Sequence, residues 1–286
     1  MRDYPFAIES LGPIAGARIG GLDLARPFGK DMMKAVNRAF LDFKVLVFKN
    51  QNLTPAEQLV FSQQFGPLEI HVLSQFNHPD YPEIFRLTNR KDDKGNPIGA
   101  ADGGSYWHSD MSYKEEPAMA TILHAKEIPD IRADTEFVDM EAACAALPAI
   151  LRQKLDGKTA IHAYRSNRQK DKGTSFKLSK EQLEETPPVR HPILRTHPET
   201  GKKSIFAFPG IVQEITGMSE IDADSLLKQV FTHCQQPEFQ FSLQWEVGDL
   251  AMWDNRCLMH RATTRDLPTD AYRMINRTTV SGDRPF

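Results

Sequence analysis

The chain has 286 residues, of which 40% are hydrophobic and 26% are charged, so it can bury a substantial core and is not disordered throughout. A formal net charge of −3 gives no global electrostatic case for binding nucleic acid or an anionic membrane. No basic-then-apolar signal pattern opens the chain, and no apolar run approaches the length of a membrane span. We therefore expect a soluble, cytoplasmic protein built as a single domain over residues 1–286, with no nucleic-acid or membrane partner.

Strands outnumber helices along the chain, because short apolar runs rich in β-branched and aromatic residues recur between turn signals. In chain order, the sequence predicts a strand at 15–24, a helix near 31–43, a strand at 45–48, a helix from Thr54 to Gly66, strands at 83–87, 119–123 and 135–138, a helical region from a cap at Asp139 to Leu155, strands at 193–196 and 204–208, a helix at 222–234, and strands at 239–245, 250–253 and 272–280. No βαβ rhythm and no G-x-G-x-x-G fingerprint accompany them. This order predicts a mainly β fold with decorating helices, a double-stranded β-helix or jelly roll.

Two polar stretches interrupt this order as loop insertions. Residues 91–104 are polar and rich in glycine, and residues 164–188 are rich in Lys, Arg, Gln, Ser and Glu. Each stretch could be a lid over a binding site or an ordinary surface excursion, and composition alone does not separate the two readings.

The segment His108-Ser109-Asp110 is half of a candidate metal site. In an extended strand, side chains two positions apart leave the same face, so His108 and Asp110 would enter one cavity together. An imidazole and a carboxylate can take adjacent positions on a divalent metal, and the distant His260 would complete a facial set with open positions. In a chain with nine histidines the bare H-x-D pattern is weak by itself.

Two arginines near the C-terminus offer a partner for an anionic cosubstrate. Arg273 and Arg277 are four positions apart in a presumed strand, a spacing that directs both side chains to one face. A 2-oxo dicarboxylate chelating the metal would leave its far carboxylate to be neutralised, and the planar guanidinium suits that task. Surface ion pairs are the alternative role for both arginines.

Taken together, the ordered motifs closely resemble the taurine and 2,4-dichlorophenoxyacetate dioxygenase family, which is Fe(II)- and 2-oxoglutarate-dependent and has a jelly-roll fold. The motifs are Trp107-His108-Ser109-Asp110, Asp134-Thr135-Glu136-Phe137, Gly248 to Arg256 followed by His260-Arg261, and Arg273 to Arg277. The resemblance implies that His108, Asp110 and His260 are the catalytic iron ligands. It also implies Fe(II), 2-oxoglutarate and O2 as cofactor and cosubstrates.

The same resemblance assigns the remaining site residues. Thr135 and Arg273 match residues that bind 2-oxoglutarate, whereas Arg277 and His71 match residues that bind the substrate's anionic group. The expected reaction hydroxylates a small organic anion (a carboxylate, an aryloxyalkanoate or a sulfonate) and releases succinate and CO2, with C–O or C–S cleavage where the hydroxylated product collapses. A homo-oligomer is also expected from the family.

Two other functions are compatible with the same residues. A zinc-dependent hydrolase could use the His/Asp/His set to activate water, and it predicts turnover without oxygen or 2-oxoglutarate. Such an enzyme gives Thr135 and Arg273 no shared task. A non-catalytic 2-oxoglutarate-binding protein of the same fold would bind the cosubstrate without turning over any substrate.

Overall fold

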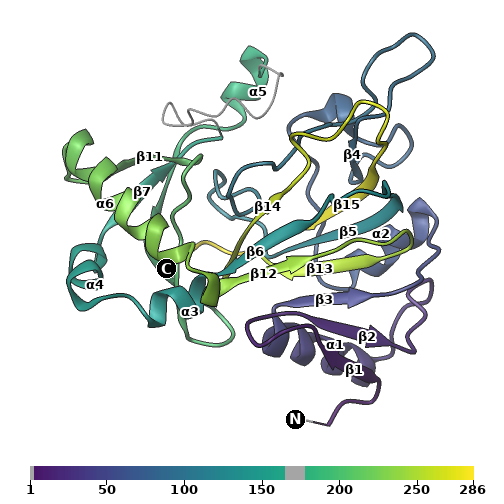
Figure 1. Cartoon of the computed structure of the whole chain (residues 1–286), viewed down its shortest axis with the longest axis horizontal. Coiled ribbons are helices and arrows are strands. Elements are labelled where there is room, and N and C mark those ends of the chain that lie inside the picture. Colours follow the sequence, from purple (N-terminus) through teal and green to yellow (C-terminus); the bar gives the residue numbers. More distant parts are fainter. Residues whose placement is uncertain (1–2, 165–177) are drawn as a thin grey trace.

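A large β-sheet dominates the structure and faces smaller sheets, with helices on the outside (Figure 1). The computed structural model describes residues 3–164 and 178–286. The part of the predicted insertion 164–188 that falls on 165–177 therefore lies outside the described residues. The prediction of a mainly β fold is confirmed.

The large sheet has seven strands and is antiparallel except where β2 runs parallel to β3. In order across the sheet they are β1 (Ala7–Ser10), β2 (Ala17–Gly20), β3 (Val45–Phe48), β13 (Leu250–Asp254), β5 (Ala120–Glu127), β15 (Met274–Val280) and β4 (Phe85–Thr88). Strands from both ends of the sequence are thus neighbours at its centre.

The smaller sheets are antiparallel. One has the order β12 (Gln240–Leu243), β6 (Thr135–Asp139) and β14 (Leu258–Ala262); a second has the order β11 (Val212–Ile215), β7 (Thr159–His162) and β8 (Val189–Pro192); β9 (Leu194–Thr196) and β10 (Lys203–Ile205) form a hairpin. In the first of these sheets, β14 pairs with β6 on one side and lies next to the site described below on the other.

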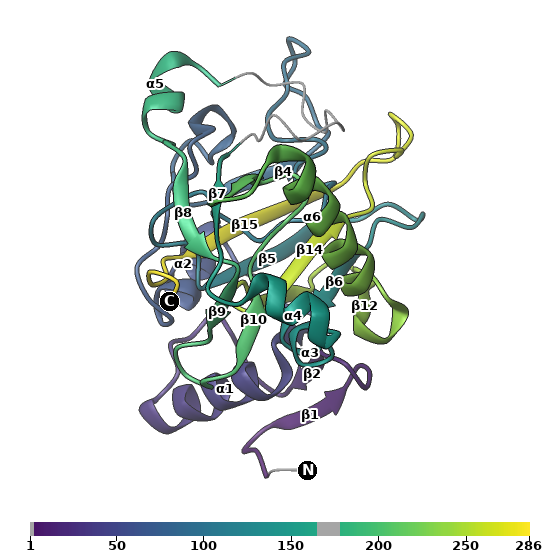
Figure 2. The same ribbon diagram turned by 90° about the vertical axis from the view of Figure 1, so that its left-hand side faces the viewer.

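Five of the six described helices fall into two groups. The helices are α1 (Lys30–Phe43), α2 (Pro55–Gln63), α3 (Met140–Ala145), α4 (Ala149–Leu155), α5 (Lys180–Glu184) and α6 (Glu220–Cys234), with 3-10 turns at Ser74–Phe76 and Pro237–Phe239. Side chains of α1 and α2 pack with the outer face of the large sheet. Figure 2 shows α3, α4 and α6 in front of the sheets, where they enclose a separate apolar cluster.

The strands at the centre of the large sheet are buried on both faces. In β3, Leu46 and Phe48 pack under the helices, whereas Val45 and Val47 point into the space between the sheets. This follows from the strand period of two, which sends alternate side chains to opposite faces. Because both faces are covered, β3 reads as a continuous apolar run, as the sequence predicted.

Several elements differ from the expected order. The predicted helical region 139–155 is two helices, because Pro148 has no amide hydrogen to continue the first one and instead precedes α4. The strands β1, β7, β8, β11 and β14 were not predicted. Most of them are short, and β14 contains no β-branched or aromatic residue, so their pairing depends on neighbours distant in sequence.

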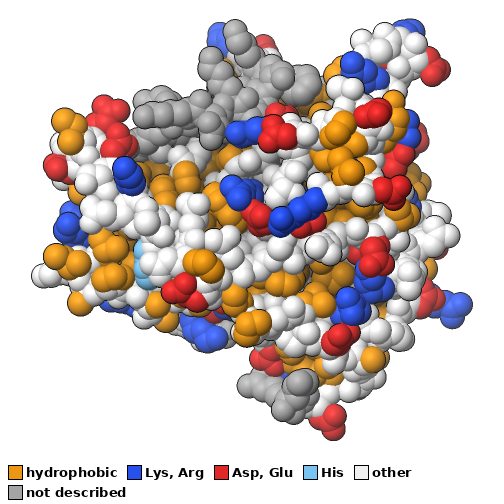
Figure 3. Space-filling view, in the orientation of Figure 1, with side chains coloured by type: hydrophobic (Ala, Val, Ile, Leu, Met, Phe, Trp, Pro, Cys, Tyr) orange, Lys and Arg blue, Asp and Glu red, His pale blue; other side chains and the backbone are white. Residues whose placement is uncertain are grey.

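The exterior carries charges of both signs. On the face shown in Figure 3, Lys and Arg side chains are interspersed with Asp and Glu side chains rather than gathered by sign. Among the described residues no helix is both long and apolar enough to cross a membrane.

A buried ionic cluster supports the turn between β13 and β14. Arg256 donates from Nε to Oδ1 of Asp254 (2.8 Å) and from Nη2 to Oδ2 (2.7 Å), and Nε2 of His197 lies 3.0 Å from the same Oδ2. Asp254 and Arg256 are 1% and 3% exposed. Removing one partner of such a pair strands the other charge away from water.

We therefore expect Asp254→Ala to lower the free energy of unfolding by about 3–5 kcal/mol. Urea denaturation followed by far-UV circular dichroism measures this change. Asp93→Ala, in an exposed loop, is the matched control and should leave the free energy of unfolding nearly unchanged. A loss for Asp254→Ala no larger than that of the control would contradict the role of the cluster.

Two histidines are buried without compensating charges in the second small sheet. His162 and His191 are 0% and 1% exposed, their ring centroids are 5.0 Å apart, and neither ring nitrogen of His162 has a hydrogen-bond partner. Burial lowers the pKa of His162 to about 3 and that of His191 to about 4. The neighbouring His191 lowers the pKa of His162 further, and the neighbouring Arg195 lowers that of His191. Both side chains are therefore neutral in the folded protein at neutral pH.

This burial predicts acid sensitivity. In the unfolded chain a histidine has a pKa of about 6.5, so below that pH the unfolded state binds more protons than the folded state. The contribution of these two histidines to the free energy of unfolding should be fully present above about pH 6.5. It should fall as the pH drops toward the folded pKa values, by on the order of 2 kcal/mol per histidine at pH 5. Urea denaturation at pH 7.5 and 5.0 tests this, and His162→Leu should lose less stability over that interval than the wild type. Equal losses would contradict the assignment.

Candidate active site

Three potential metal ligands converge between the large sheet and β14. Nε2 of His108 lies 3.6 Å from Oδ1 of Asp110, and Nε2 of His260 lies 3.5 Å from Oδ2 of the same carboxylate. The donor atoms of the three residues all lie within 4.8 Å of one another, and all three side chains are buried. Two imidazoles and a carboxylate on one side of a cavity match the facial donor set that suits Fe(II).

The backbone brings the two histidines together. His108 donates its amide hydrogen to the carbonyl of His260 (N···O 3.0 Å), and His260 donates to the carbonyl of His108 (2.8 Å). The strand predicted around His108 is wrong, since this isolated bridge is followed by a turn in which Met111 has a positive φ of 53°. The turn, rather than strand alternation, directs Asp110 back toward His108.

Hydrogen bonds prepare His108 to bind a metal through Nε2. Nδ1 of His108 lies 2.7 Å from the carbonyl oxygen of Tyr106, which can only accept, so Nδ1 carries the proton. This leaves the lone pair of Nε2 directed at the cluster. Burial and the neighbouring His108 lower the pKa of His260 to about 3, so His260 is neutral.

Asp110 is held ionised. Burial alone would raise the pKa of its carboxyl group, but the Arg277 guanidinium beside it outweighs burial and holds that pKa well below its usual range. Nη1 of Arg277 donates to Oδ1 (3.1 Å) and the hydroxyl of Thr121 donates to Oδ2 (2.6 Å). The donor set is thus two imidazoles and one carboxylate, which fits a divalent cation.

Sequence reasoning missed the residues that orient this carboxylate. Asn255 donates from Nδ2 to Oγ1 of Thr121 (2.9 Å), and its Oδ1 accepts from Nε1 of Trp253 (3.1 Å). Its carbonyl accepts the hydroxyl of Ser109 (2.8 Å). Asn255 thus connects the turn that carries Asp110 to β5 and β13, and such supporting hydrogen bonds tune the ligands they hold.

Beyond the cluster, a cavity extends to a buried arginine. Besides the three candidate ligands, it is lined by apolar side chains and by Thr135, Arg273 and Arg277. Arg273 is 5% exposed, its Nε has no hydrogen-bond partner, and no carboxylate of the described residues pairs with it. Burial lowers its pKa to about 10, which leaves the guanidinium charged at neutral pH. A buried, unpaired cation is suited to a ligand carboxylate.

Thr135 lies in the same cavity as Arg273. Its Oγ1 accepts a hydrogen bond from Nε1 of Trp245 (2.9 Å). Because that contact uses an acceptor site, the hydroxyl hydrogen of Thr135 can be donated to a ligand in the cavity. The structure therefore brings together Thr135, the first residue of β6, and Arg273, which immediately precedes β15.

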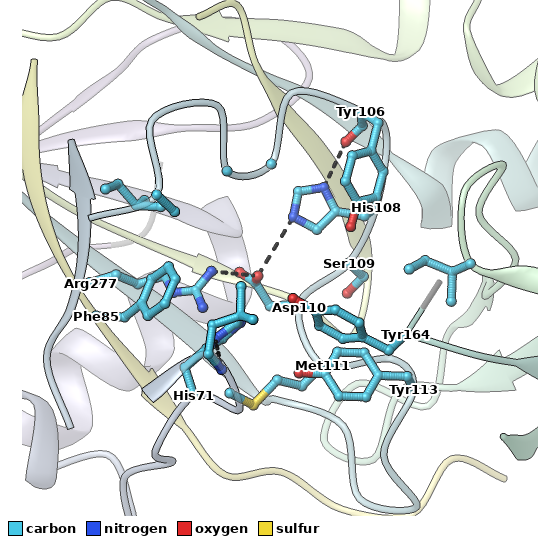
Figure 4. Close-up of a pocket in the computed structure, with 16 residues that line it drawn as sticks. His71, Phe85, Tyr106, His108, Ser109, Asp110, Met111, Tyr113, Tyr164 and Arg277 are labelled. Carbon is cyan, nitrogen blue, oxygen red and sulfur yellow. Dashed lines mark hydrogen bonds and ion pairs between the residues drawn. The ribbon is translucent and has the colours of Figure 1, made fainter. Parts of the chain in front are cut away.

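A second cavity adjoins the first, and His108, Asp110 and Arg277 line both of them (Figure 4). The His71 ring lies against the Phe85 ring at a tilt of 39°, with 4.1 Å between ring centroids, and the Arg277 guanidinium lies 4.8 Å from the centre of the Phe85 ring. Burial and the Arg277 charge lower the pKa of His71 well below its usual value, so His71 is neutral. The two predicted substrate residues thus share one wall of this cavity.

The end of the loop 91–104 borders both cavities. Gly103 and Gly104 line them, and Gly104 has a φ of +78°. A Cβ at position 104 would lie 3.0 Å from Cε1 of His108, closer than ordinary contact allows. Glycine at this position leaves the His108 ring undisturbed.

A second group of possible ligands is structural. Glu141, His197 and Cys257 also bring donor atoms within 4.8 Å of one another. Both ring nitrogens of His197 are already used, Nε2 by Asp254 and Nδ1 by backbone amides, and Nζ of Lys44 lies 2.9 Å from Glu141. Burial raises the pKa of Cys257 well above its usual value, so its thiol stays protonated. Protein groups therefore satisfy this cluster without a metal.

Comparison with protein families gives one match across almost the whole chain. The model for "Taurine catabolism dioxygenase TauD, TfdA family" matches residues 7–279. The alpha-ketoglutarate-dependent 2,4-dichlorophenoxyacetate dioxygenase of Cupriavidus pinatubonensis is 32% identical over 283 residues, covering 96% of each chain. An alkylsulfatase of Acinetobacter baylyi is 29% identical over 283 residues, covering 94% of this chain and 82% of that protein.

Solved structures show the same architecture. A taurine dioxygenase from Burkholderia xenovorans superposes with a TM-score of 0.81 at 28% identity, covering 98% of this chain and 90% of that one. AAD-2, in complex with Mn(II) and N-oxalylglycine, gives a TM-score of 0.81 at 29% identity and covers 98% of both chains. The described sheets therefore form the jelly roll that the sequence predicted.

Proposed function

Because the chain belongs to the taurine catabolism dioxygenase TauD, TfdA family and is an Fe(II)- and 2-oxoglutarate-dependent dioxygenase, we propose that it hydroxylates a small organic anion. The candidates are a carboxylate, an aryloxyalkanoate or a sulfonate. One observation carries this proposal: the donor atoms of His108, Asp110 and His260 converge where a cavity that reaches Arg273 adjoins a cavity that contains His71 and Arg277.

In this proposal His108, Asp110 and His260 hold the iron. With 2-oxoglutarate and O2, bound Fe(II) supplies the oxidation of a substrate C–H bond, releasing succinate and CO2. The two imidazoles and the carboxylate would hold Fe(II) as a facial donor set, with room for 2-oxoglutarate and O2. The bond from Thr121 to Oδ2 and that from Arg277 to Oδ1 keep the carboxylate oriented.

Arg273 and Thr135 anchor the far carboxylate of 2-oxoglutarate. The guanidinium pairs with that carboxylate inside a cavity walled by Leu87, Leu123 and Trp253, where water is excluded and the attraction is strong. The hydroxyl of Thr135 donates to the same group. Anchoring this end fixes the position of the keto acid at the other end of the molecule.

Arg277 and His71 bind the anionic group of the substrate. Since Nη1 of Arg277 already donates to Asp110, an anion on the same guanidinium is held beside the metal ligands. His71 is neutral and therefore serves as a hydrogen-bond donor rather than a cation. Hydroxylation of a carbon that carries oxygen or sulfur gives an unstable product, whose collapse cleaves the C–O or C–S bond.

Anaerobic reconstitution tests the proposal directly. The apoprotein is loaded with Fe(II) and 2-oxoglutarate and watched for the visible metal-to-ligand charge-transfer band. Phenoxyacetate, phenylacetate, taurine and alkyl sulfonates are then added one at a time. Oxygen is admitted last, and succinate is assayed. We expect the band to form, to shift with one of these compounds, and to be followed by succinate formation coupled to that compound.

Two outcomes would contradict the proposal. A wild-type protein with verified iron content that gives no band would overturn the assignment of the 2-oxoglutarate site. Turnover of an ester or amide in the absence of oxygen and 2-oxoglutarate would instead favour the zinc-dependent hydrolase.

A further inference from the structure

Tyr113 places a buried hydroxyl in the substrate cavity without a partner. The side chain lines that cavity, is 5% exposed, and its hydroxyl oxygen has no hydrogen-bond partner. Leaving a buried polar group unsatisfied costs about 1–3 kcal/mol, whereas a phenylalanine would fill the same volume without that cost. Within the described protein the unpaired hydroxyl is therefore destabilising, and a hydrogen-bond acceptor in the cavity would offset that cost.

The orientation of the ring supports this reading. Tyr113 meets Tyr164 edge-on, with 4.7 Å between ring centroids and an interplanar angle of 86°. Figure 4 shows the hydroxyl end of Tyr113 directed toward the side of the cavity that holds His71. Burial and the nearby Tyr164 raise the pKa of Tyr113 well above its usual value, so the hydroxyl keeps its proton and can donate.

Two other donors face the same cavity. Nδ1 of His71 accepts a hydrogen bond from the backbone amide of Leu73 (3.1 Å), so the ring proton is on Nε2. Nε of Arg277 has no partner. The three donors come from separate segments: His71 follows α2, Tyr113 precedes β5, and Arg277 lies in β15. Two of the three, the Tyr113 hydroxyl and Nε of Arg277, have no hydrogen-bond partner among the described residues.

We propose that Tyr113 is a specificity-determining residue whose hydroxyl donates a hydrogen bond to the anionic group of the substrate, beside Arg277 and His71. The inference rests on the proposed function and adds a contact to the same site. Three donors from three separate segments that line one cavity suit a head group with three terminal oxygens, a sulfonate or a sulfate monoester. A planar carboxylate offers two oxygens in one plane and satisfies fewer of these donors.

Tyr113→Phe tests the proposal with two independent measurements. The first compares unfolding of the metal-free, ligand-free proteins in urea, where the variant should be as stable as the wild type or more stable. The second measures binding of phenylmethanesulfonate and phenylacetate to the anaerobic Fe(II)- and 2-oxoglutarate-loaded proteins by calorimetry. Binding of the sulfonate should weaken about ten-fold, and binding of the carboxylate should weaken by less.

Tyr81→Phe is the matched control, because Tyr81 is a partly buried tyrosine that does not line the cavity. It should leave both measurements unchanged. A ligand-free Tyr113→Phe protein less stable than the wild type would assign the hydroxyl a structural partner and overturn the proposal. Equal affinity of the wild type and the variant for both probes would also overturn it, as would a 2-oxoglutarate-binding wild type that binds neither probe.

The two measurements separate this inference from the proposed function. If the wild type fails to bind 2-oxoglutarate, the proposed function fails. The stability of the ligand-free proteins still tests whether the Tyr113 hydroxyl has a structural partner. If 2-oxoglutarate binds and succinate forms but Tyr113→Phe changes neither stability nor affinity, only the inference fails.

Discussion

Asp110→Ala is expected to abolish iron binding and to lower turnover by at least about 10²-fold, more than the loss typical of a residue that only supports a ligand. The carboxylate is the sole negative charge among the three proposed ligands, so its removal leaves two neutral imidazoles facing a cation. It also strands the Arg277 guanidinium, whose Nη1 donates to Oδ1 of Asp110. Iron content after anaerobic dialysis and succinate formation measure the two effects.

Asp110→Asn separates charge from shape. The amide keeps the size of the carboxylate but loses its charge, so the variant should bind iron weakly while unfolding in urea close to the wild type. Asp93→Asn, in an exposed loop, controls for the loss of one negative charge and should keep full activity. An Asp110→Ala protein with full hydroxylase activity would refute the role of Asp110 as a ligand.

Arg273→Met is expected to raise the Kd of the anaerobic Fe(II)-loaded protein for 2-oxoglutarate by about 10²-fold or more, because it removes one partner of a desolvated ion pair. In the ligand-free protein the same change should leave stability unchanged or improve it, since this buried guanidinium has no carboxylate partner among the described residues. The opposite signs of the two effects identify a residue placed for a ligand rather than for the fold. Calorimetric titration with 2-oxoglutarate and urea denaturation measure them.

Arg26→Met serves as the control for Arg273→Met. The Arg26 side chain is 86% exposed, so removing its charge should change neither measurement. Arg273→Met protein that binds 2-oxoglutarate as tightly as the wild type would contradict the assignment of the cavity beyond the iron ligands. A marked loss of stability in the ligand-free variant would point to a structural role for Arg273.

Elements whose signals are local could be predicted from the sequence. The capping box at α2 forms as expected, because Oγ1 of Thr54 accepts from the amide of Glu57 and the Glu57 carboxylate accepts from the amide of Thr54. The apolar run 45–48 becomes β3 with the same bounds. The family resemblance, the jelly roll, the enzyme class and its cofactors are likewise confirmed.

Features that depend on tertiary contact were beyond local patterns. His260 was found through a motif, yet β14 around it was not predicted, because its strand character comes from pairing with β6. Thr121 and Asn255 contact Asp110 only after the chain has folded. Thr121 is the polar residue in the middle of the apolar run 119–123, and that position is the sequence signal that could have identified it. The single domain, the homo-oligomer and lid roles for 91–104 and 164–188 stay predictions.

The reciprocal backbone bonds between His108 and His260 have a consequence for metal selectivity. Those bonds tie the backbones of two of the three proposed ligands to each other, so the spacing of the two imidazoles does not depend on which divalent ion binds. The donor types then govern the relative affinities. Affinity for such nitrogen and oxygen donors rises from Mn(II) through Fe(II) to Ni(II) and Cu(II). Iron occupancy is then decided by the supply of free metals, and contaminating nickel or copper acts as a competitive poison.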